Sequence, residues 1–116
     1  MKIITICGSH RFSHEIKQIA EKLALEGNCV LTPIELTKSG KYAYTAEDLA
    51  LLGQIHKEKI RLSDAIFVAN VGGYLGDSTK AEIAFAQSLN KEIIYYHHTD
   101  RIQSNHTAVM QEEHLH

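Results

Sequence analysis

The sequence predicts a single α/β domain built on a parallel β-sheet, and three observations support this. Short apolar runs alternate with longer segments of helical periodicity. Their order, with four apolar runs separated by three helical segments, is the one that builds right-handed βαβ units around a parallel sheet. The chain has 116 residues, which is about the size of one domain. We therefore expect one three-layer domain over residues 1–97, followed by a polar tail or short docking helix over 98–116.

Four apolar runs have the length and composition of buried parallel strands. They are residues 2–7, 29–32, 65–69 and 93–96. Residues that break strands follow the first three of them: Gly8, Pro33, and a glycine-rich loop that starts at Asn70. Cys7 and Cys29 fall inside two of these runs without the spacing of metal ligands, so we expect both to be reduced core residues.

Three segments have the periodicity of helices. The first covers about 13–26, with Ser13 as its N-cap and Gly27 at its end. The second covers about 46–62 and is capped by Thr45, with acidic residues in its first turn. The third follows the glycine-rich loop, and its expected apolar face consists of Ala81, Ala84, Phe85, Ser88 and Leu89. The strands and helices together predict a flavodoxin-like three-layer sandwich, in which a parallel sheet of about four strands has the order 2-1-3-4.

The composition excludes several classes of partner. The formal net charge is −2, and the lysines and arginines are spread along the chain, so nucleic acid is not an expected partner. The apolar runs are strand-sized and the start of the chain has no signal-peptide pattern, which predicts a cytoplasmic protein without a membrane span. Histidines of the tail lack the paired spacing of zinc ligands, so we expect neither a metal nor a cofactor.

Candidate ligand residues follow from the parallel sheet, because such sheets bind ligands outside the carboxyl ends of their strands. Three loops meet there, over residues 8–11, 33–44 and 70–78. In the first, a glycine, a hydroxyl and a guanidinium precede a helix N-terminus, which suits a phosphate or carboxylate; the alternative is a simple turn with a solvated arginine. The candidate binding residues are Gly8, Ser9, Arg11, Asn70, Gly73, Asp77 and Ser78.

Glu82 is the candidate reactive group. It lies about one turn into the third helix, and an apolar stretch, residues 83–86, follows it. A carboxylate at such a place can border a cavity and act as a nucleophile or general base. The alternative is a solvated charge beside Lys80 at the favourable end of the helix dipole.

The chain resembles the nucleoside 2-deoxyribosyltransferase superfamily, which includes the deoxynucleoside monophosphate N-glycosidases. The resemblance covers about residues 1–96 and rests on the order of Gly8-Ser9-His10-Arg11, the strand 63–68, the segment 81–86 and Lys91-Glu92-Ile93. It implies that Glu82 attacks the anomeric carbon of a 2-deoxyribose, that the base leaves, and that the sugar passes to water or to another base. It also implies that Gly8, Ser9 and Arg11 hold a phosphate.

Two functions remain open at this point. An aspartate that orients the sugar in the superfamily is absent here, and His56 stands at its place. We take His56 and Asp64 as catalytic candidates beside Glu82, for cleavage or transfer at the N-glycosidic bond of a nucleoside or nucleotide. The alternative is a nucleotide-binding module of the same fold without catalysis. A third function, that of a phosphoacceptor domain, is not expected. Such a domain needs acidic residues at the strand ends, whereas the first strand ends in Cys7-Gly8.

We also expect a homodimer or higher homo-oligomer. The second helix and the preceding loop carry more apolar surface than one sheet face needs, with Tyr42, Tyr44, Leu51 and Leu52 as the main contributors. Members of the superfamily pack as dimers or larger assemblies, which points the same way.

Overall fold

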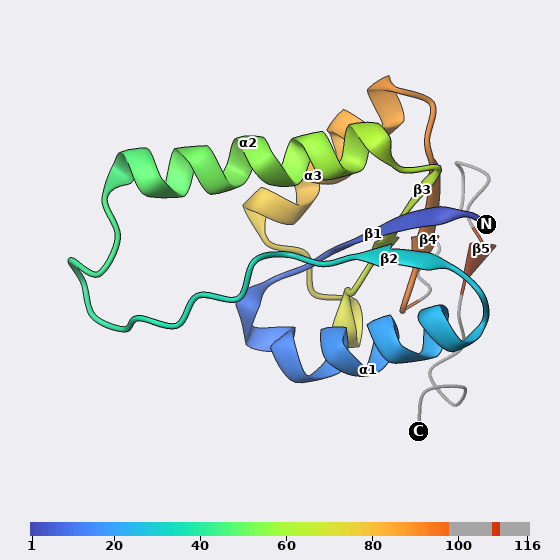
Figure 1. Cartoon of the computed structure of the whole chain (residues 1–116), viewed down its shortest axis with the longest axis horizontal. Coiled ribbons are helices and arrows are strands. Elements are labelled where there is room, and N and C mark those ends of the chain that lie inside the picture. Colours follow the sequence, from blue (N-terminus) through green and yellow to red (C-terminus); the bar gives the residue numbers. More distant parts are fainter. Residues whose placement is uncertain (98–107, 110–116) are drawn as a thin grey trace.

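A computed structural model describes residues 1–97 and 108–109, and it has three layers, with a parallel sheet between helices (Figure 1). The strands are β1 (Ile3–Cys7), β2 (Cys29–Leu31), β3 (Ala65–Val68), β4 (Glu92–Tyr95) and β5 (Ala108–Val109), in the spatial order β2-β1-β3-β4-β5. The helices are α1 (Ser13–Leu25), α2 (Ala46–Leu62) and α3 (Asp77–Ser88). Short 3₁₀ turns, η1 (His10–Phe12) and η2 (Val71–Gly73), follow β1 and β3. The predicted fold and the order 2-1-3-4 of the first four strands are confirmed.

The helices divide between the two faces of the sheet, as Figure 1 shows with α1 on one side and α2 and α3 on the other. Alternate residues of each central strand point to opposite faces. In β3, Phe67 packs toward α1, whereas Ile66 and Val68 pack toward α2 and α3. All four residues of β3 are fully buried, which explains why its sequence is a continuous apolar run.

The fifth strand was not predicted. Ala108 and Val109 pair in parallel with Ile94 and Tyr95, so two residues of the expected tail or docking helix extend the sheet instead. The physical reason is that β4 has an edge whose backbone groups can pair with a further strand. Residues 98–107 and 110–116, with the tail histidines, lie outside the described part of the chain.

Capping differs between the first two helices. Thr45 is the predicted cap of α2 and forms a capping box with Asp48, in which each side chain accepts a hydrogen bond from the other residue's backbone N–H. Ser13, in contrast, is the first residue of α1 rather than its N-cap. The cap is displaced because η1 intervenes, and Ser9 caps that turn by accepting a hydrogen bond from the Arg11 backbone N–H.

Burial corrects two predictions, the apolar face of the third helix and the core position of Cys29. The face of α3 that packs on the sheet consists of Thr79, Ile83 and Ala86, whereas most of the expected face is exposed. In α2 only His56 and Ile60 are buried, because the amino-terminal half of this helix extends beyond the sheet edge (Figure 1). Cys29 is exposed, not a core residue, since it starts the edge strand β2; Cys7 is buried, and both are free thiols. None of the described helices has the length and apolar character needed to cross a membrane.

Asn70 joins the ends of the two strands β3 and β4. Its side chain is fully buried, accepts a hydrogen bond from the His97 backbone N–H at 2.9 Å and donates one to the His97 carbonyl oxygen at 2.8 Å. The amide therefore bonds to the backbone of His97 through both its oxygen and its nitrogen, and it fixes the path of the chain where it leaves β4.

We predict that Asn70→Ala lowers the free energy of unfolding by about 2 kcal/mol, because a buried amide that makes two backbone hydrogen bonds is removed. Urea denaturation followed by circular dichroism measures the change. Gln87→Ala on the exposed side of α3 is the matched control and should change stability by less than about 0.5 kcal/mol. Equal stability of the two variants would contradict the structural role of Asn70.

Candidate functional site

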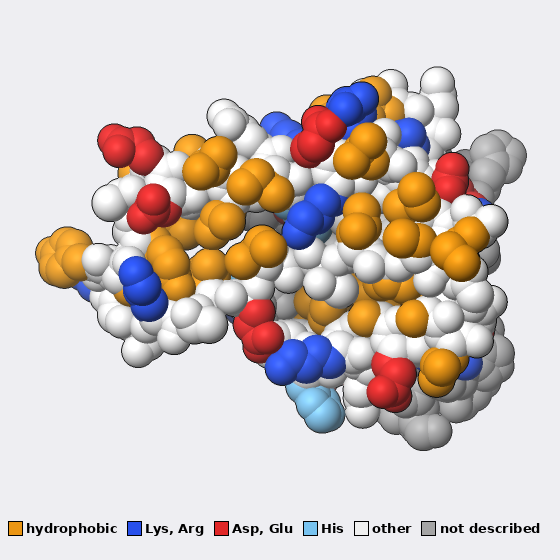
Figure 2. All heavy atoms as spheres, viewed as in Figure 1, with side chains coloured by type: hydrophobic (Ala, Val, Ile, Leu, Met, Phe, Trp, Pro, Cys, Tyr) orange, Lys and Arg blue, Asp and Glu red, His pale blue; other side chains and the backbone are white. Residues whose placement is uncertain are grey.

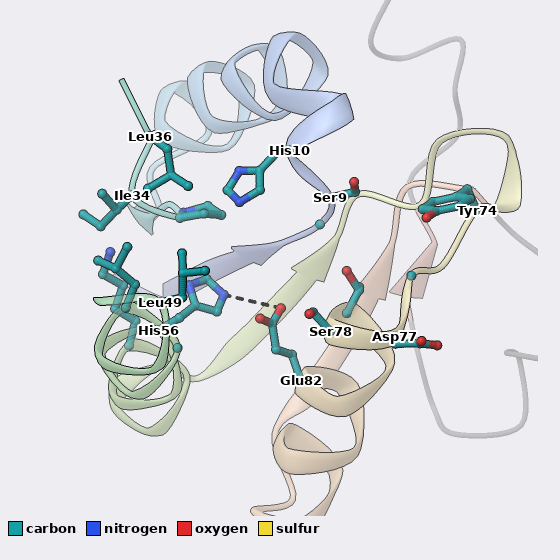
Figure 3. Close-up of a pocket in the computed structure, with 17 residues that line it drawn as sticks. Ser9, His10, Ile34, Leu36, Leu49, His56, Tyr74, Asp77, Ser78 and Glu82 are labelled. Carbon is teal, nitrogen blue, oxygen red and sulfur yellow. Dashed lines mark ion pairs between the residues drawn. The ribbon is translucent and has the colours of Figure 1, made fainter. Parts of the chain in front are cut away.

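A cavity of about 520 Å³ opens at the carboxyl ends of the strands, where the parallel sheet predicts a ligand site (Figure 3). One wall is polar and comes from the loop after β1 and the start of α3. The opposite wall is apolar and comes from the segment after β2 and from α2. The polar wall includes Gly8, Ser9, Gly76, Asp77, Ser78 and Thr79, and the apolar wall includes Pro33, Ile34, Leu36, Leu49 and Leu52.

Glu82 and His56 meet at the bottom of this cavity. Figure 3 shows the carboxylate of Glu82 on α3 facing the imidazole of His56 on α2, with Oε1 3.6 Å from Nε2. The two side chains are 22% and 10% exposed, so both are largely screened from water while their polar ends border the cavity. At 3.6 Å the contact is longer than a normal hydrogen bond, and a small movement is enough to close it.

Cys7 completes a buried cluster with these two residues. Its Sγ lies 3.5 Å from His56 Nε2, within hydrogen-bond distance for sulfur. The Sγ, Nε2 and Glu82 carboxylate oxygen all lie within 4.8 Å of one another. The other ring nitrogen of His56, Nδ1, is buried and has no hydrogen-bond partner within the described residues. The three groups thus form a polar pocket enclosed by α2, α3 and the end of β1.

Burial controls the protonation of all three groups. It raises the pKa of Glu82 to about 7, against smaller lowering effects of the Cys7 thiol hydrogen bond and the Lys57 charge. Burial, with the charge of Lys59, lowers the pKa of His56 to about 4. Burial and the adjacent Glu82 raise the pKa of Cys7 well above its usual value. At neutral pH the site therefore holds a neutral imidazole, a thiol and a carboxyl group that is about half ionised.

The polar wall presents backbone donors toward the same space. Gly76 is the N-cap of α3, and within the described residues no side chain caps this end, so the first N–H groups of the helix can bind an oxygen of a ligand. Gly8 lies where the backbone passes close to β3, and a Cβ there would come within 3.1 Å of the Ala69 Cβ. Ser9 and Ser78 add hydroxyl groups at this wall.

The structure brings together most of the predicted site residues and separates four of them. The predicted residues that line the cavity are Gly8, Ser9, His56, Asp77, Ser78 and Glu82. Asp64 does not line the cavity, because it directly precedes β3 and so lies at the amino ends of the strands. Its carboxylate accepts a hydrogen bond from the Ile3 backbone N–H at 2.7 Å. Arg11 is exposed and stacks over the Tyr74 ring at 4.0 Å, outside the lining. The Asn70 side chain is hydrogen-bonded to the backbone of His97, and Gly73 lies in η2 and does not line the cavity.

Sequence reasoning missed Cys7 and His10 as site residues. Cys7 was assigned to the core, although its place as the last residue of β1 is a signal that it borders the ligand edge. His10 lines the cavity in η1, one residue before the arginine that was preferred. The 3₁₀ turn η1 brings His10, and not Arg11, into the lining of the cavity. The local sequence does not predict this turn.

Comparison with known proteins assigns the fold. Neither the protein-family models nor the curated proteins include a match to this sequence. The structure is similar to a solved 2-desoxiribosyltransferase from Leishmania mexicana, with a TM-score of 0.61 and 17% identity over 83% of this chain and 64% of that one. It is also similar to a conserved protein from Enterococcus faecalis V583, with a TM-score of 0.61 and 18% identity over 87% of this chain and 66% of that one. The chain thus has the nucleoside 2-deoxyribosyltransferase-like fold and spans slightly less than two thirds of the length of each neighbour.

The opposite pKa shifts of Glu82 and His56 predict opposite effects of pH on stability. A raised carboxyl pKa stabilises the folded state below the ordinary pKa of 4.5, and this contribution is lost as the pH rises to about 7. A lowered imidazole pKa contributes stability above 6.5 that is lost as the pH falls to about 4. The two effects therefore oppose each other between about pH 4.5 and 6.5 in the wild type.

Single substitutions separate these effects. Relative to wild type, Glu82→Gln should gain up to about 3 kcal/mol of unfolding free energy as the pH rises from 4.5 to 7, because the destabilising ionisation is removed. His56→Gln should lose a similar amount of unfolding free energy relative to wild type as the pH rises from 4 to 6.5, because the stabilisation by the neutral imidazole is absent. Denaturant unfolding at several pH values measures both differences. Parallel pH profiles for the wild type and both variants would contradict the shifts.

Proposed function

We propose that this protein cleaves or transfers the N-glycosidic bond of a 2-deoxynucleoside or its monophosphate, with Glu82 as the nucleophile. The observation that carries the proposal is the largely buried carboxylate of Glu82 facing a cavity that has one polar and one apolar wall. A largely buried carboxylate makes few hydrogen bonds to water, so its attack on a bound sugar needs little desolvation at the moment of reaction. The fold, shared with a protein described as a 2-desoxiribosyltransferase, supports the same chemistry.

The reaction has two steps. The Glu82 carboxylate attacks C1′ of the deoxyribose, and the bond between C1′ and the base nitrogen breaks, with its electron pair leaving on the base. Water or a second base then attacks C1′ and releases the carboxylate, and the proton that the attacking group loses balances the proton taken up by the departing base. Cys7 and His56 position the carboxylate through the contacts described above.

The two walls suit the two ends of such a substrate. Leu49, Leu52 and Ile34 offer an apolar surface for a flat base. Ser9, Ser78 and the free N–H groups at the start of α3 offer donors for the sugar hydroxyls or a 5′-phosphate. Arg11 contacts the cavity only through the Tyr74 ring, so we assign it a positioning role rather than direct phosphate binding.

We predict that the wild type releases free base from at least one common 2-deoxynucleoside or its monophosphate and that Glu82→Gln abolishes this release. The amide keeps the shape of the side chain and loses the attacking charge, so ligand affinity should stay within a few-fold of wild type. Chromatography measures the base, and intact-protein mass spectrometry detects the deoxyribosyl adduct. Activity should rise between pH 6 and 8, because the reactive form of Glu82 appears through a pKa of about 7.

Glu47→Gln, an exposed substitution in the first turn of α2, is the matched control and should leave base release unchanged. Binding of nucleotides by the wild type without base release, and without an adduct, would favour the non-catalytic nucleotide-binding module. Equal activity of wild type and Glu82→Gln would remove Glu82 from the reaction.

We also propose that α2 and the loop before it dock on a second copy of this chain. Figure 2 shows hydrophobic side chains gathered over this helix and loop. The exposed members are Ile34, Tyr42, Leu49, Leu51, Ile55 and Leu62, with Tyr42 88% exposed. Two of them, Ile34 and Leu49, also line the cavity, so a second copy placed here would cover its open side.

We expect sedimentation at micromolar concentration to show a dimer or larger species. Leu51→Glu should shift the protein to a 13.0 kDa monomer, because the charge would be buried at the interface. Leu25→Glu is the control, since Leu25 is 83% exposed at the end of α1 on the other face of the sheet. A wild type that sediments only as the monomer would refute this assembly.

A further inference from the structure

Cys7, His56 and Glu82 present a sulfur, a nitrogen and an oxygen that are all common ligands of zinc. They come from three separate elements, β1, α2 and α3, and no two are closer than 26 positions in the sequence. Within the described residues, Nε2 lies 3.5 Å from Sγ and 3.6 Å from the Glu82 Oε1. In the proposed base release Cys7 and His56 position the Glu82 carboxylate, and the same three groups are also suited to hold a metal ion.

The separations fit a single metal ion between the three atoms. Zinc bonds of about 2.3 Å to sulfur and 2.0–2.2 Å to nitrogen or oxygen, in tetrahedral geometry, place the ligand atoms about 3.3–3.6 Å apart. The two separations from Nε2 match this range. The third, between Sγ and the carboxylate oxygen, is within 4.8 Å, so a side-chain movement that closes it completes such a set.

The charge of the cluster also favours a divalent cation. The Cys7 thiol and the Glu82 carboxyl, which can each lose a proton to become an anion, are enclosed together beside the His56 imidazole. Neither neighbouring lysine pairs directly with them: the Lys59 ammonium donates to the Thr32 carbonyl oxygen at 2.8 Å, and the Lys57 ammonium lies 5.6 Å from the centre of the Phe85 ring. A dication would balance both negative charges, and a thiolate ligand selects zinc over magnesium or calcium.

We propose that Cys7, His56 and Glu82 form a binding site for Zn²⁺, with the fourth coordination position open to the cavity. On binding, the thiol and any protonated Glu82 carboxyl release their protons to solvent, and sulfur, Nε2 and a carboxylate oxygen each donate an electron pair to the metal. The open position resembles that of three-ligand zinc sites, which keep one place for water or a ligand atom.

Zinc at this site also gives a means of regulation. A Glu82 carboxylate that shares its negative charge with a bound zinc ion is a weaker nucleophile toward a sugar carbon, so zinc should inhibit base release and a chelator should restore it. This consequence rests on the proposed function, whereas the metal site itself rests on the geometry of the three ligands. The test therefore measures binding separately from activity.

The experiment uses the purified full chain, freed of metal by a chelator and titrated with Zn²⁺ or Co²⁺ alone. We expect one zinc ion per chain at this site and at least about tenfold weaker binding in Cys7→Ser and in Glu82→Gln. Cobalt should give a thiolate charge-transfer absorption that is absent in Cys7→Ser. Zinc should also raise the thermal unfolding midpoint of the wild type and not that of Glu82→Gln.

Cys29→Ser is the matched control, because Cys29 is the exposed free thiol and lies outside the cluster. It should keep the cobalt absorption and the wild-type zinc affinity. All variants retain the tail histidines, so zinc affinity that is unchanged in both Cys7→Ser and Glu82→Gln would assign binding to another site and overturn the proposal. If Cys7→Ser fails to fold, Glu82→Gln decides by itself, since its side chain keeps the same shape. A chain that binds zinc at this site but releases no base would sustain the metal site and overturn the proposed function.

Discussion

The burial of the central strands on both faces is the constraint on which the rest of the structure depends. β1 and β3 lie between α1 on one face and α2 with α3 on the other, so their middle positions accept almost only apolar side chains. The main exception is Thr5, whose hydroxyl is paired at 2.6 Å with that of Ser63. Other chemistry must lie at the ends of the strands, and the cavity forms at the end where β1 and β3 stop.

The same constraint sets the protonation of the site. Cys7 is the last buried residue of β1, and the polar groups packed above it, His56 and Glu82, are partly removed from water with it. Desolvation disfavours charge on each of them, which moves the carboxyl and imidazole pKa values in opposite directions. The proposed nucleophilic attack and the proposed metal binding would both use this poised state, because each replaces a proton or a solvent contact with a bond. Both need the Glu82 carboxylate, which links the two proposals.

The amino-terminal half of α2 extends beyond the sheet, and this has two consequences. Only His56 and Ile60 of this helix are buried, and its amino-terminal half forms one wall of the cavity. The apolar side chains on that half, such as Leu49 and Leu51, remain half exposed. The cavity and the surface proposed for a second copy therefore arise from the same feature, and a covered interface would also limit the access of water to Glu82.

The sequence by itself determined the order of elements, the parallel sheet and the ends of the strands at which the cavity lies, because apolar periodicity and strand-ending residues are local signals. It also placed Glu82 at the head of α3. Only the tertiary structure decided that Cys7 and His56 meet Glu82. It also decided that Arg11 lies over the Tyr74 ring and that Asp64 lies at the amino ends of the strands, opposite the cavity. Those outcomes depend on which turn of each helix packs against which strand end. Helix packing of this kind is set by long-range contacts, which no local pattern of residues records.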